Sequence, residues 1–254
     1  MTLDLSPRPA AAPLPRQVLA HAGMEARLML RNGEQLLIAV VIPVIVLVGG
    51  VRGADRLGLD YDHPVVDVFV PGVLALAVMS TAFTSLAIAT GFERRYGVIK
   101  WLGASPLPRT GLLAGKVGAL VLVETLQVVV VVGVGLALGW DPAGGWAGAL
   151  LAVVLGTAAF SSLGLLVAGV LRAEATLAVA NLVYLLLLAG GAVVLPASAY
   201  GGFGDLVRWL PSGALGEAMR DALVDGTVGW THLLVLAGWA VVGAALTART
   251  FRWE

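Results

Sequence analysis

The chain of 254 residues contains no cysteine, and this absence excludes disulfide bonds, thiolate metal sites and a cysteine nucleophile. Charged residues are also scarce, at 13% of the sequence against about 25% in an average soluble domain. The 16 basic residues balance the 16 acidic ones, so the overall charge does not indicate a nucleic-acid partner. The three histidines, His21, His63 and His232, lie far apart, and this spacing disfavours a metal cluster.

A phosphate-binding loop of the form GxxxxGK[ST] is absent as well. The nearest string runs from Gly111 to Val117, but it has one spacer residue too few and ends on valine instead of Ser or Thr. A membrane enzyme would need a convergent set of acids, bases or metal ligands, and the sequence shows no such set. The sequence therefore predicts a chain without a catalytic, cofactor or metal site, and any ATP-driven work would need a separate chain that binds ATP.

Hydrophobic residues are abundant instead, at 59% of the sequence. A soluble domain this apolar could not cover its own surface, and a membrane-spanning helix needs about 20 apolar residues. Six apolar runs reach or approach that length: 35–51, 68–92, 117–140, 142–171, 175–204 and 226–248. We therefore predict an all-α integral membrane protein with six transmembrane helices.

Basic residues are distributed unequally between the two ends of these predicted spans. With six spans both termini lie on one side, and twelve of the 16 Lys and Arg residues fall on that side. Because loops rich in Lys and Arg stay in the cytoplasm, we expect both termini to be cytoplasmic. The predicted location is the cell membrane, as a multi-pass protein.

The N-terminal part divides into two segments. Residues 1–15 contain four prolines and no signal-peptide core, which predicts a flexible arm. Residues 16–34 separate an apolar from an arginine-bearing face, which is typical of an amphipathic helix in the membrane interface. The alternative is a cytosolic extension of the first span. Residues 16–254 are expected to form a single membrane domain.

A dense polar region, residues 93–116, separates the second and third apolar runs and carries five of the basic residues. We expect a short helix of about residues 96–102 inside it, stopped by Gly103 and Pro106. Apolar side chains among charged neighbours could anchor a partner there. These side chains are Val98, Ile99, Trp101 and Leu102. The alternative is that the region only sets the topology and contacts lipid head groups.

The predicted loop between the fifth and sixth spans, residues 196–225, begins apolar and becomes polar. Pro196 should end the fifth helix, and two short helices, 203–210 and 215–223, are expected beyond it. Ser212 is a candidate N-cap for the second of them. We predict that these outer helices are re-entrant, because protein can cover broken backbone inside the membrane. The alternative is an outer loop with two surface helices.

The polar region and the outer segment carry a series of short motifs. They are Glu93-Arg94-Arg95, Gly97-Val98-Ile99-Lys100-Trp101-Leu102, Ser105-Pro106-Leu107-Pro108-Arg109, Gly115-Lys116, Trp209-Leu210-Pro211, Glu217-Ala218-Met219-Arg220 and Arg249-Thr250-Phe251-Arg252. Their order and spacing, together with six spans, resemble the permease subunits of type-two ABC exporters, which move drugs, lipids or polysaccharides. The resemblance covers nearly the whole chain. Two positions depart from the family's commoner residues: Val98 stands where Thr is usual, and Pro108 where Ser is usual.

The resemblance implies one half of an ATP-driven exporter. A dimer of permeases, either two copies of this chain or this chain with a related one, would sit on two copies of an ABC ATPase that binds ATP and magnesium. Residues 93–116 would be the coupling region that docks into the ATPase, and residues 16–34 the connecting helix along the bilayer. The residues implied at the ATPase contact are Glu93, Arg94, Arg95, Tyr96, Val98, Ile99, Lys100, Trp101 and Leu102.

An acidic residue, Glu124, lies inside the third apolar run. An ionisable group within a bilayer is costly, so it indicates either a function or a structural partner. A proton or substrate role and a structural ion pair are both open. If Glu124 couples transport to an ion gradient, the chain would instead be a secondary transporter, although such carriers often show internal repeats and this sequence shows none.

Two further groups of polar residues could line a path through the membrane. Thr81, Thr84 and Ser85 share one face of the second run, and Asn181 and Tyr184 are neighbours on the fifth. The alternative is ordinary hydrogen bonding between helices. An apolar path with a few hydroxyl groups would suit a hydrophobic or amphipathic substrate such as a drug, a natural product or a lipid.

Overall fold

A computed structural model describes residues 12–31, 33–57, 63–103 and 107–250. Every regular element within these ranges is helical, which confirms the predicted all-α class. In chain order they are α1 Leu14–Arg31, α2 Gly33–Leu57, α3 Val65–Met79, the π-helix η1 Ser80–Ser85, α4 Leu86–Arg95, α5 Val98–Gly103, α6 Arg109–Ala137, α7 Trp146–Val170, α8 Ala173–Gly190, the 3-10 helix η2 Ala197–Phe203, α9 Gly204–Val207, α10 Pro211–Leu223 and α11 Trp230–Thr250.

Five helical stretches within the described ranges are long and apolar enough to cross a membrane. They are Val65–Arg95, which joins α3, η1 and α4, then Thr110–Ala137, Trp146–Val170, Ala173–Gly190 and Trp230–Thr250. They correspond to the second through sixth predicted runs. Where the first run was predicted, α2 contains a shorter apolar stretch, Ala39–Ala54. These helices confirm the prediction of a multi-pass membrane protein.

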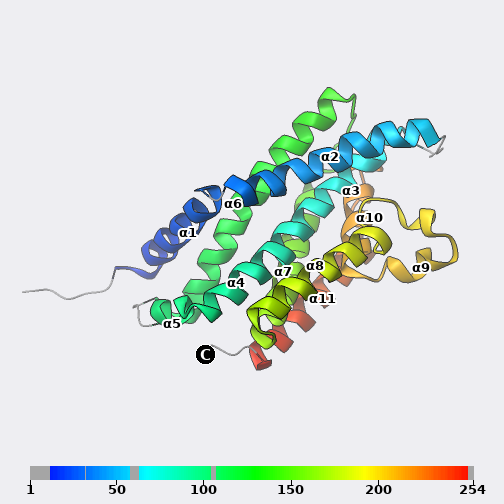
Figure 1. Cartoon of the computed structure of the whole chain (residues 1–254). Helices are drawn as coiled ribbons and strands as arrows, with labels where there is room; N and C mark the ends of the chain where they lie inside the picture. Colours follow the sequence, from blue (N-terminus) through cyan, green and yellow to red (C-terminus); the bar gives the residue numbers. More distant parts are fainter. Residues whose placement is uncertain (1–11, 32, 58–62, 104–106, 251–254) are drawn as a thin grey trace, which may run out of the picture.

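The span Val65–Arg95 lies at the centre of the bundle (Figure 1). α3 is buried along almost its whole length and packs against α2, α6, α7 and α10. The helix widens into the π-helical turn η1 before the α-helix resumes at Leu86. Such turns are rare inside α-helices and often occur at functional sites.

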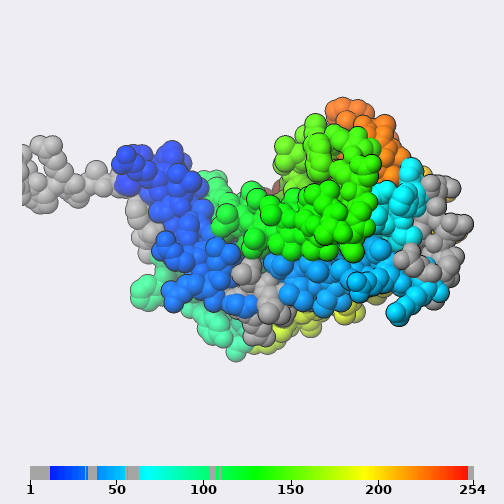
Figure 2. Space-filling view, turned by 90° about the horizontal axis from the view of Figure 1, so that it is seen from above, coloured from blue at the N-terminus to red at the C-terminus, as the bar shows by residue number. Residues whose placement is uncertain are grey.

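α1 and α2 both pack alongside α6 on one face of the molecule (Figure 2). α1 corresponds to the predicted interfacial helix 16–34, but it ends at Arg31, and α2 begins as a new helix at Gly33. It also starts at Leu14, inside the segment predicted as an arm, with Pro15 in its first turn. Proline is tolerated there because its missing N–H would have no partner within the helix. Most of the predicted arm 1–15 falls outside the described residues.

α7 packs closely against the centre of the bundle because small residues line its inner face. Gly164 is the clearest example: a Cβ atom at this position would lie 2.8 Å from the carbonyl oxygen of Phe83 in η1. A Cβ atom at Gly156 would likewise lie 2.7 Å from the side chain of Leu215 in α10. These positions let α7 approach both η1 and α10.

The fifth predicted span ends earlier than the sequence indicated. α8 stops at Gly190, whereas the break had been expected at Pro196. Ala192 then takes a positive φ of 52°, a conformation that side-chain-bearing residues rarely adopt. The helix therefore ends before its proline because the backbone beyond Gly190 finds other partners.

Those partners belong to Arg220 in α10. Its buried guanidinium donates hydrogen bonds to the four carbonyl oxygens of residues 192–195, at 3.0 to 3.4 Å. Glu217 balances the charge, with its Oε1 atom 3.1 Å from Arg220 Nη2, and also accepts the backbone N–H of Ala197. This ion pair between the buried Arg220 and the half-buried Glu217 thus holds the unwound segment after α8.

The outer segment 196–225 differs in detail from its prediction. Of the helix expected over 203–210, only residues 204–207 form an α-helix, α9. The helix expected over 215–223 begins earlier, at Pro211, as α10. Ser212 does not act as an N-cap, because its hydroxyl donates to the carbonyl oxygen of Gly191 at 2.8 Å. α10 is almost entirely buried against α3, α7 and α11, so it belongs to the core.

The two ends of the bundle carry different elements (Figure 1). α1, α5 and the C-terminal end of α11 gather at one end. η2 and α9 lie at the opposite end. The polar region after α4 therefore lies at the same end of the bundle as the end of α11.

Candidate functional site

The predicted coupling region leaves the bundle after α4. Gly97 has a φ of 72°, which favours glycine, and turns the chain into the short helix α5. Trp101 on α5 is 83% exposed, and Tyr96, Val98 and Lys100 are exposed beside it. We call these four residues the α5 patch. It is an aromatic surface with one positive charge, held at one end of the bundle.

Two of the predicted contact residues do not lie on this surface. Ile99 is buried and Leu102 is half-buried. Both line a small apolar space that also includes Leu112 of α6 and Leu165 of α7. They therefore anchor α5 to the bundle, while the patch faces outward.

The arginines before α5 hold the turn in place. Arg94 donates to the carbonyl oxygen of Ala168, near the end of α7. Arg95 pairs with Glu174 at the start of α8, and its guanidinium lies 5.8 Å from the centroid of the Tyr96 ring. These contacts fix the position of the α5 patch relative to the hairpin between α7 and α8.

Glu93 points into the bundle, where it joins a cluster of charged side chains from three helices. Lys116 Nζ of α6 lies 2.6 Å from the Glu93 carboxylate and 3.1 Å from that of Glu25 in α1. His21, one turn before Glu25, places its Nε2 atom 3.6 Å from the same carboxylate. Our sequence analysis did not identify this cluster, although the i, i+4 spacing of His21 and Glu25 on one helix was a visible signal. We call these four residues the α1 latch.

The hydroxyl residues predicted along the second span have separate environments. Thr81 is buried and donates to the side chain of Gln127 at 2.9 Å. Gln127 in turn donates to the carbonyl oxygen of Ala39 at 2.8 Å, so the pair links η1, α6 and α2. Thr84 and Ser85 are half-buried in η1. Thr81 therefore bonds within the bundle.

The predicted polar pair on the fifth span is also divided. Asn181 is exposed on the surface of α8. Tyr184 is half-buried and shares a hydrogen bond with Ser80 of η1. The structure thus brings Tyr184, but not Asn181, to the π-helical turn, and a path along these residues stays a prediction.

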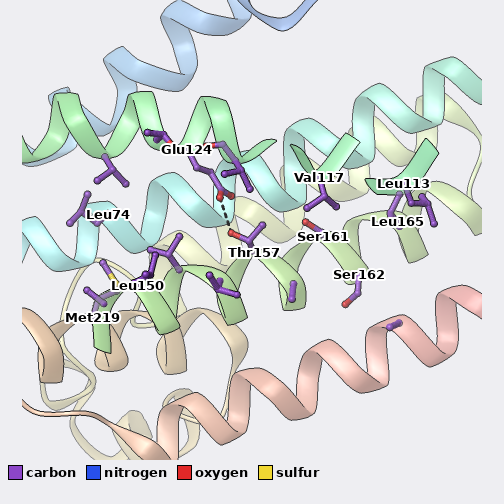
Figure 3. A pocket seen from close by; sticks show the side chains of 18 of the residues that line it. Leu74, Leu113, Val117, Glu124, Leu150, Thr157, Ser161, Ser162, Leu165 and Met219 are labelled. Atoms are coloured by element: carbon purple, nitrogen blue, oxygen red, sulfur yellow. Dashed lines mark hydrogen bonds between the residues drawn. The ribbon is translucent and has the colours of Figure 1, made fainter. Parts of the chain in front are cut away.

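A large cavity lies elsewhere, in a groove between α6, α7 and α11 with α10 at one end (Figure 3). It encloses about 900 Å³, and its walls are mostly Leu, Val and Ala side chains. On α6 the lining extends from Thr110 to Val132, about 33 Å at the α-helical rise. That length matches the roughly 30 Å hydrocarbon core of a bilayer.

Glu124 occupies the middle of this groove and is only 3% exposed. The hydroxyl of Thr157 in α7 donates to its Oε2 atom at 2.8 Å, as Figure 3 shows. Its Oε1 atom has no hydrogen-bond partner among the described residues. Within the same ranges no Lys, Arg or His forms an ion pair with it. Among the described residues, Glu124 is therefore a buried acid without a structural cation.

No group of three His, Cys, Asp or Glu side chains in the described part of the chain could hold a metal ion. The described residues offer three features for binding. They are an apolar groove for a hydrophobic body, one acid within that groove, and an aromatic patch at the end of the bundle.

Comparison with known proteins points to one family. The family model described as "ABC-2 family transporter protein" matches residues 61–249. The daunorubicin resistance ABC transporter permease protein DrrB1 of Streptomyces coeruleorubidus is 28% identical, and the alignment covers 98% of this chain and 91% of that protein. YvfS of Bacillus subtilis (strain 168), named as a transport permease, is 21% identical over 68% of this chain and 72% of its own. The chain therefore belongs to the ABC-2 transporter family, as the membrane subunit of an ABC transporter in the cell membrane.

Proposed function

We propose that this chain is the permease subunit of an ATP-driven exporter that moves a hydrophobic or amphipathic molecule out of the cell. Family membership supports transport, and the relative named for daunorubicin resistance supports outward movement of a drug-like molecule. The large apolar groove is a surface on which a molecule of that class could bind. A drug, a natural product or a lipid all fit this description.

The proposed topology has six spans with both termini in the cytoplasm. α2 would be the first span, since its 25 residues extend about 37 Å although its apolar part is shorter. α1 would lie in the interface, packed on α6. The outer segment would dip back into the membrane, which is consistent with three exposed apolar side chains on η2, α9 and the residues after them, Phe203, Leu206 and Trp209.

The exposed Trp101 is the single observation that carries the partner proposal. A tryptophan that is 83% exposed, on a rigidly held helix at one end of the bundle, is typical of an unoccupied protein interface. We propose that the α5 patch docks an ABC ATPase, which binds ATP and magnesium and supplies the energy. Two ATPase copies would serve two permease chains, most simply two copies of this one.

The docking proposal is tested by purifying the tagged chain from its native membranes in mild detergent and identifying bound P-loop ATPases by mass spectrometry. Trp101→Ala should reduce the recovered ATPase about tenfold or more, because an interface tryptophan typically contributes over 2 kcal/mol. Trp230→Ala, which changes another exposed tryptophan at the start of α11, should leave recovery unchanged. Equal recovery with wild type and Trp101→Ala would place the contact elsewhere.

The buried carboxyl of Glu124 keeps one alternative open, an ion-gradient-driven transporter in which this acid carries the coupling proton. Vesicles with reconstituted transporter decide between the two. Under the exporter proposal, transport requires ATP on the side of the vesicle membrane where the α5 patch is exposed. Transport should also continue after an ionophore has collapsed the proton gradient. Transport that stops with the gradient and ignores ATP would favour the alternative.

A further inference from the structure

The groove beside α6 has two polar atoms that the protein itself does not satisfy. Glu124 Oε1 and Ser161 Oγ are both buried, and neither has a hydrogen-bond partner in the ranges that the structure describes. Both residues line the groove, Glu124 from α6 and Ser161 from α7 (Figure 3). Ser161 lies one helical turn beyond Thr157, which already bonds to the other carboxylate oxygen. Buried polar groups of this kind are rare and often mark a place where a partner is missing.

The other hydroxyl groups along the groove are mostly occupied. Ser162 donates to the carbonyl oxygen of Ala159, Thr125 to that of Val121 and Thr247 to that of Ser162. The unsatisfied hydrogen-bonding capacity is therefore concentrated at Glu124 and Ser161. What this pair offers is two acceptor oxygens, one of them on an acid.

The groove is open to the side of the bundle at the depth of the bilayer. Three of its lining residues, Val121, Leu150 and Val154, are 49 to 65% exposed. A molecule dissolved in the membrane could therefore enter without passing through the cytosolic end. The enclosed volume of about 900 Å³ is large enough for a drug-sized molecule, since such sites usually measure about 300 to 1,000 Å³.

We infer that this groove binds an amphipathic organic cation, with its protonated amine between Glu124 Oε1 and Ser161 Oγ and its hydrophobic body along α6 and α7. An ammonium group supplies both the donors that these oxygens lack and the charge that a buried carboxylate needs. A neutral lipid tail would fill the apolar walls but leave both oxygens unsatisfied. This inference rests on the proposed export function and names its substrate class and binding place.

The test measures binding to the full-length chain in nanodiscs of phosphatidylcholine, without ATP or ATPase. Two probes are compared, a dansyl-labelled long-chain primary amine and the alcohol with the same chain and label, each corrected for uptake by empty nanodiscs. Wild type should bind the amine about tenfold more tightly than the alcohol. Glu124→Gln should remove that preference and leave alcohol binding unchanged.

Three further variants make the result specific. Ser161→Ala should weaken amine binding by several-fold, and it supplies an independent answer if Glu124→Gln is poorly folded. Val154→Trp fills the groove and should weaken both probes. Asp205→Asn removes an exposed carboxylate on α9 and should change neither.

Equal wild-type affinity for the two probes, or a preference that survives Glu124→Gln, would overturn the inference. So would a Val154→Trp variant that binds both probes normally but changes its oligomeric state, because the groove would then be covered by a second copy of the chain. Failure of this binding test with intact ATPase recovery would reject only the cation site. A wild-type chain that recovers no ATPase but binds the amine normally would reject only the export mechanism.

Discussion

Lys116 of α6 lies 2.6 Å from the carboxylate of Glu93 near the end of α4. The same ammonium lies 3.1 Å from Glu25 of α1, and all three side chains are largely buried. Glu93 therefore joins α4 to α6 and α1, instead of extending outward beside the α5 patch. A change in the packing of α1 would therefore alter the contacts of α4, the helix that leads into that patch.

Removing the cation of the α1 latch should loosen α1. Lys116→Met leaves Glu93 and Glu25 close together without a positive charge, and breaking a buried pair in this way typically costs about 3 kcal/mol. We expect a lower melting temperature in detergent and faster proteolysis within α1. Lys100→Met removes an exposed lysine from α5 and should change neither measurement. A Lys116→Met variant as stable as wild type would show that the latch contributes little.

The attachment of α1 should weaken at acidic pH. Burial lowers the pKa of His21 below its ordinary value of 6.5, opposed by the nearby Glu25 carboxylate and reinforced by the Lys116 ammonium. The unfolded chain then binds a proton more readily than the folded one, so this contribution to stability is present above about pH 6.5 and is lost as pH falls through the lowered pKa. The hydrogen-exchange protection factors of α1, which correct for the intrinsic exchange rate at each pH, should therefore fall between pH 7.5 and pH 5. His21→Asn should show a smaller change with pH, and an identical profile in the two proteins would assign the effect to other groups.

The outer segment should depend on Arg220. Arg220→Leu removes the donor to four carbonyl oxygens and leaves the half-buried Glu217 carboxylate without its partner, a loss of roughly 3 kcal/mol. We expect a poorly expressed protein whose residues 192–195 are accessible to protease. Arg220→Lys keeps the charge but not the forked geometry, so it should restore stability only in part. Arg208→Met, at an exposed ion pair, is the matched control, and equal effects of the two arginine losses would contradict the assignment.

The close contact between α7 and η1 should tolerate no side chain. Gly164→Ala introduces a Cβ atom 2.8 Å from the backbone oxygen of Phe83, and backbone cannot move aside as a side chain can. We expect a loss of about 1 to 3 kcal/mol, the usual range for overpacking. Thermal unfolding of Gly238→Ala gives the comparison, because that helical glycine has no atom within 4 Å of the added Cβ and alanine favours the helix. A destabilised Gly238→Ala and an unchanged Gly164→Ala would reverse the prediction.

Much of the helical architecture could be predicted because its signals are local. Apolar runs long enough to span a bilayer predict α-helices, since no other open backbone arrangement satisfies its hydrogen bonds in lipid. The second to sixth runs match five membrane-length helices in the described ranges. The boundaries were less accurate: α6 begins at Arg109 and not at the first residue of the apolar run, Val117, because a helix can continue past the membrane through polar residues.

The partners of the polar residues could not be predicted, because they are distant in the sequence. Glu124 was visible as an acid within an apolar run, but its partner Thr157 lies 33 positions away on the next helix. Arg220 was visible in a motif, but its bonds to residues 192–195 depend on α10 folding back against the end of α8. In both cases the residue type indicated importance, and the role followed from the neighbour.

The sequence by itself determined that this protein is a helical membrane protein, with a polar region after its second span and a family resemblance that the comparisons confirm. These properties follow from hydrophobicity, length and motif order, each of which can be read along the chain. Only the tertiary structure decided that Glu93 closes a latch on α1, that α8 ends at Gly190 and that Glu124 faces a groove. Those outcomes depend on which charges and hydrogen-bonding groups meet when the helices pack, and a buried group is stable only beside the partner that packing provides.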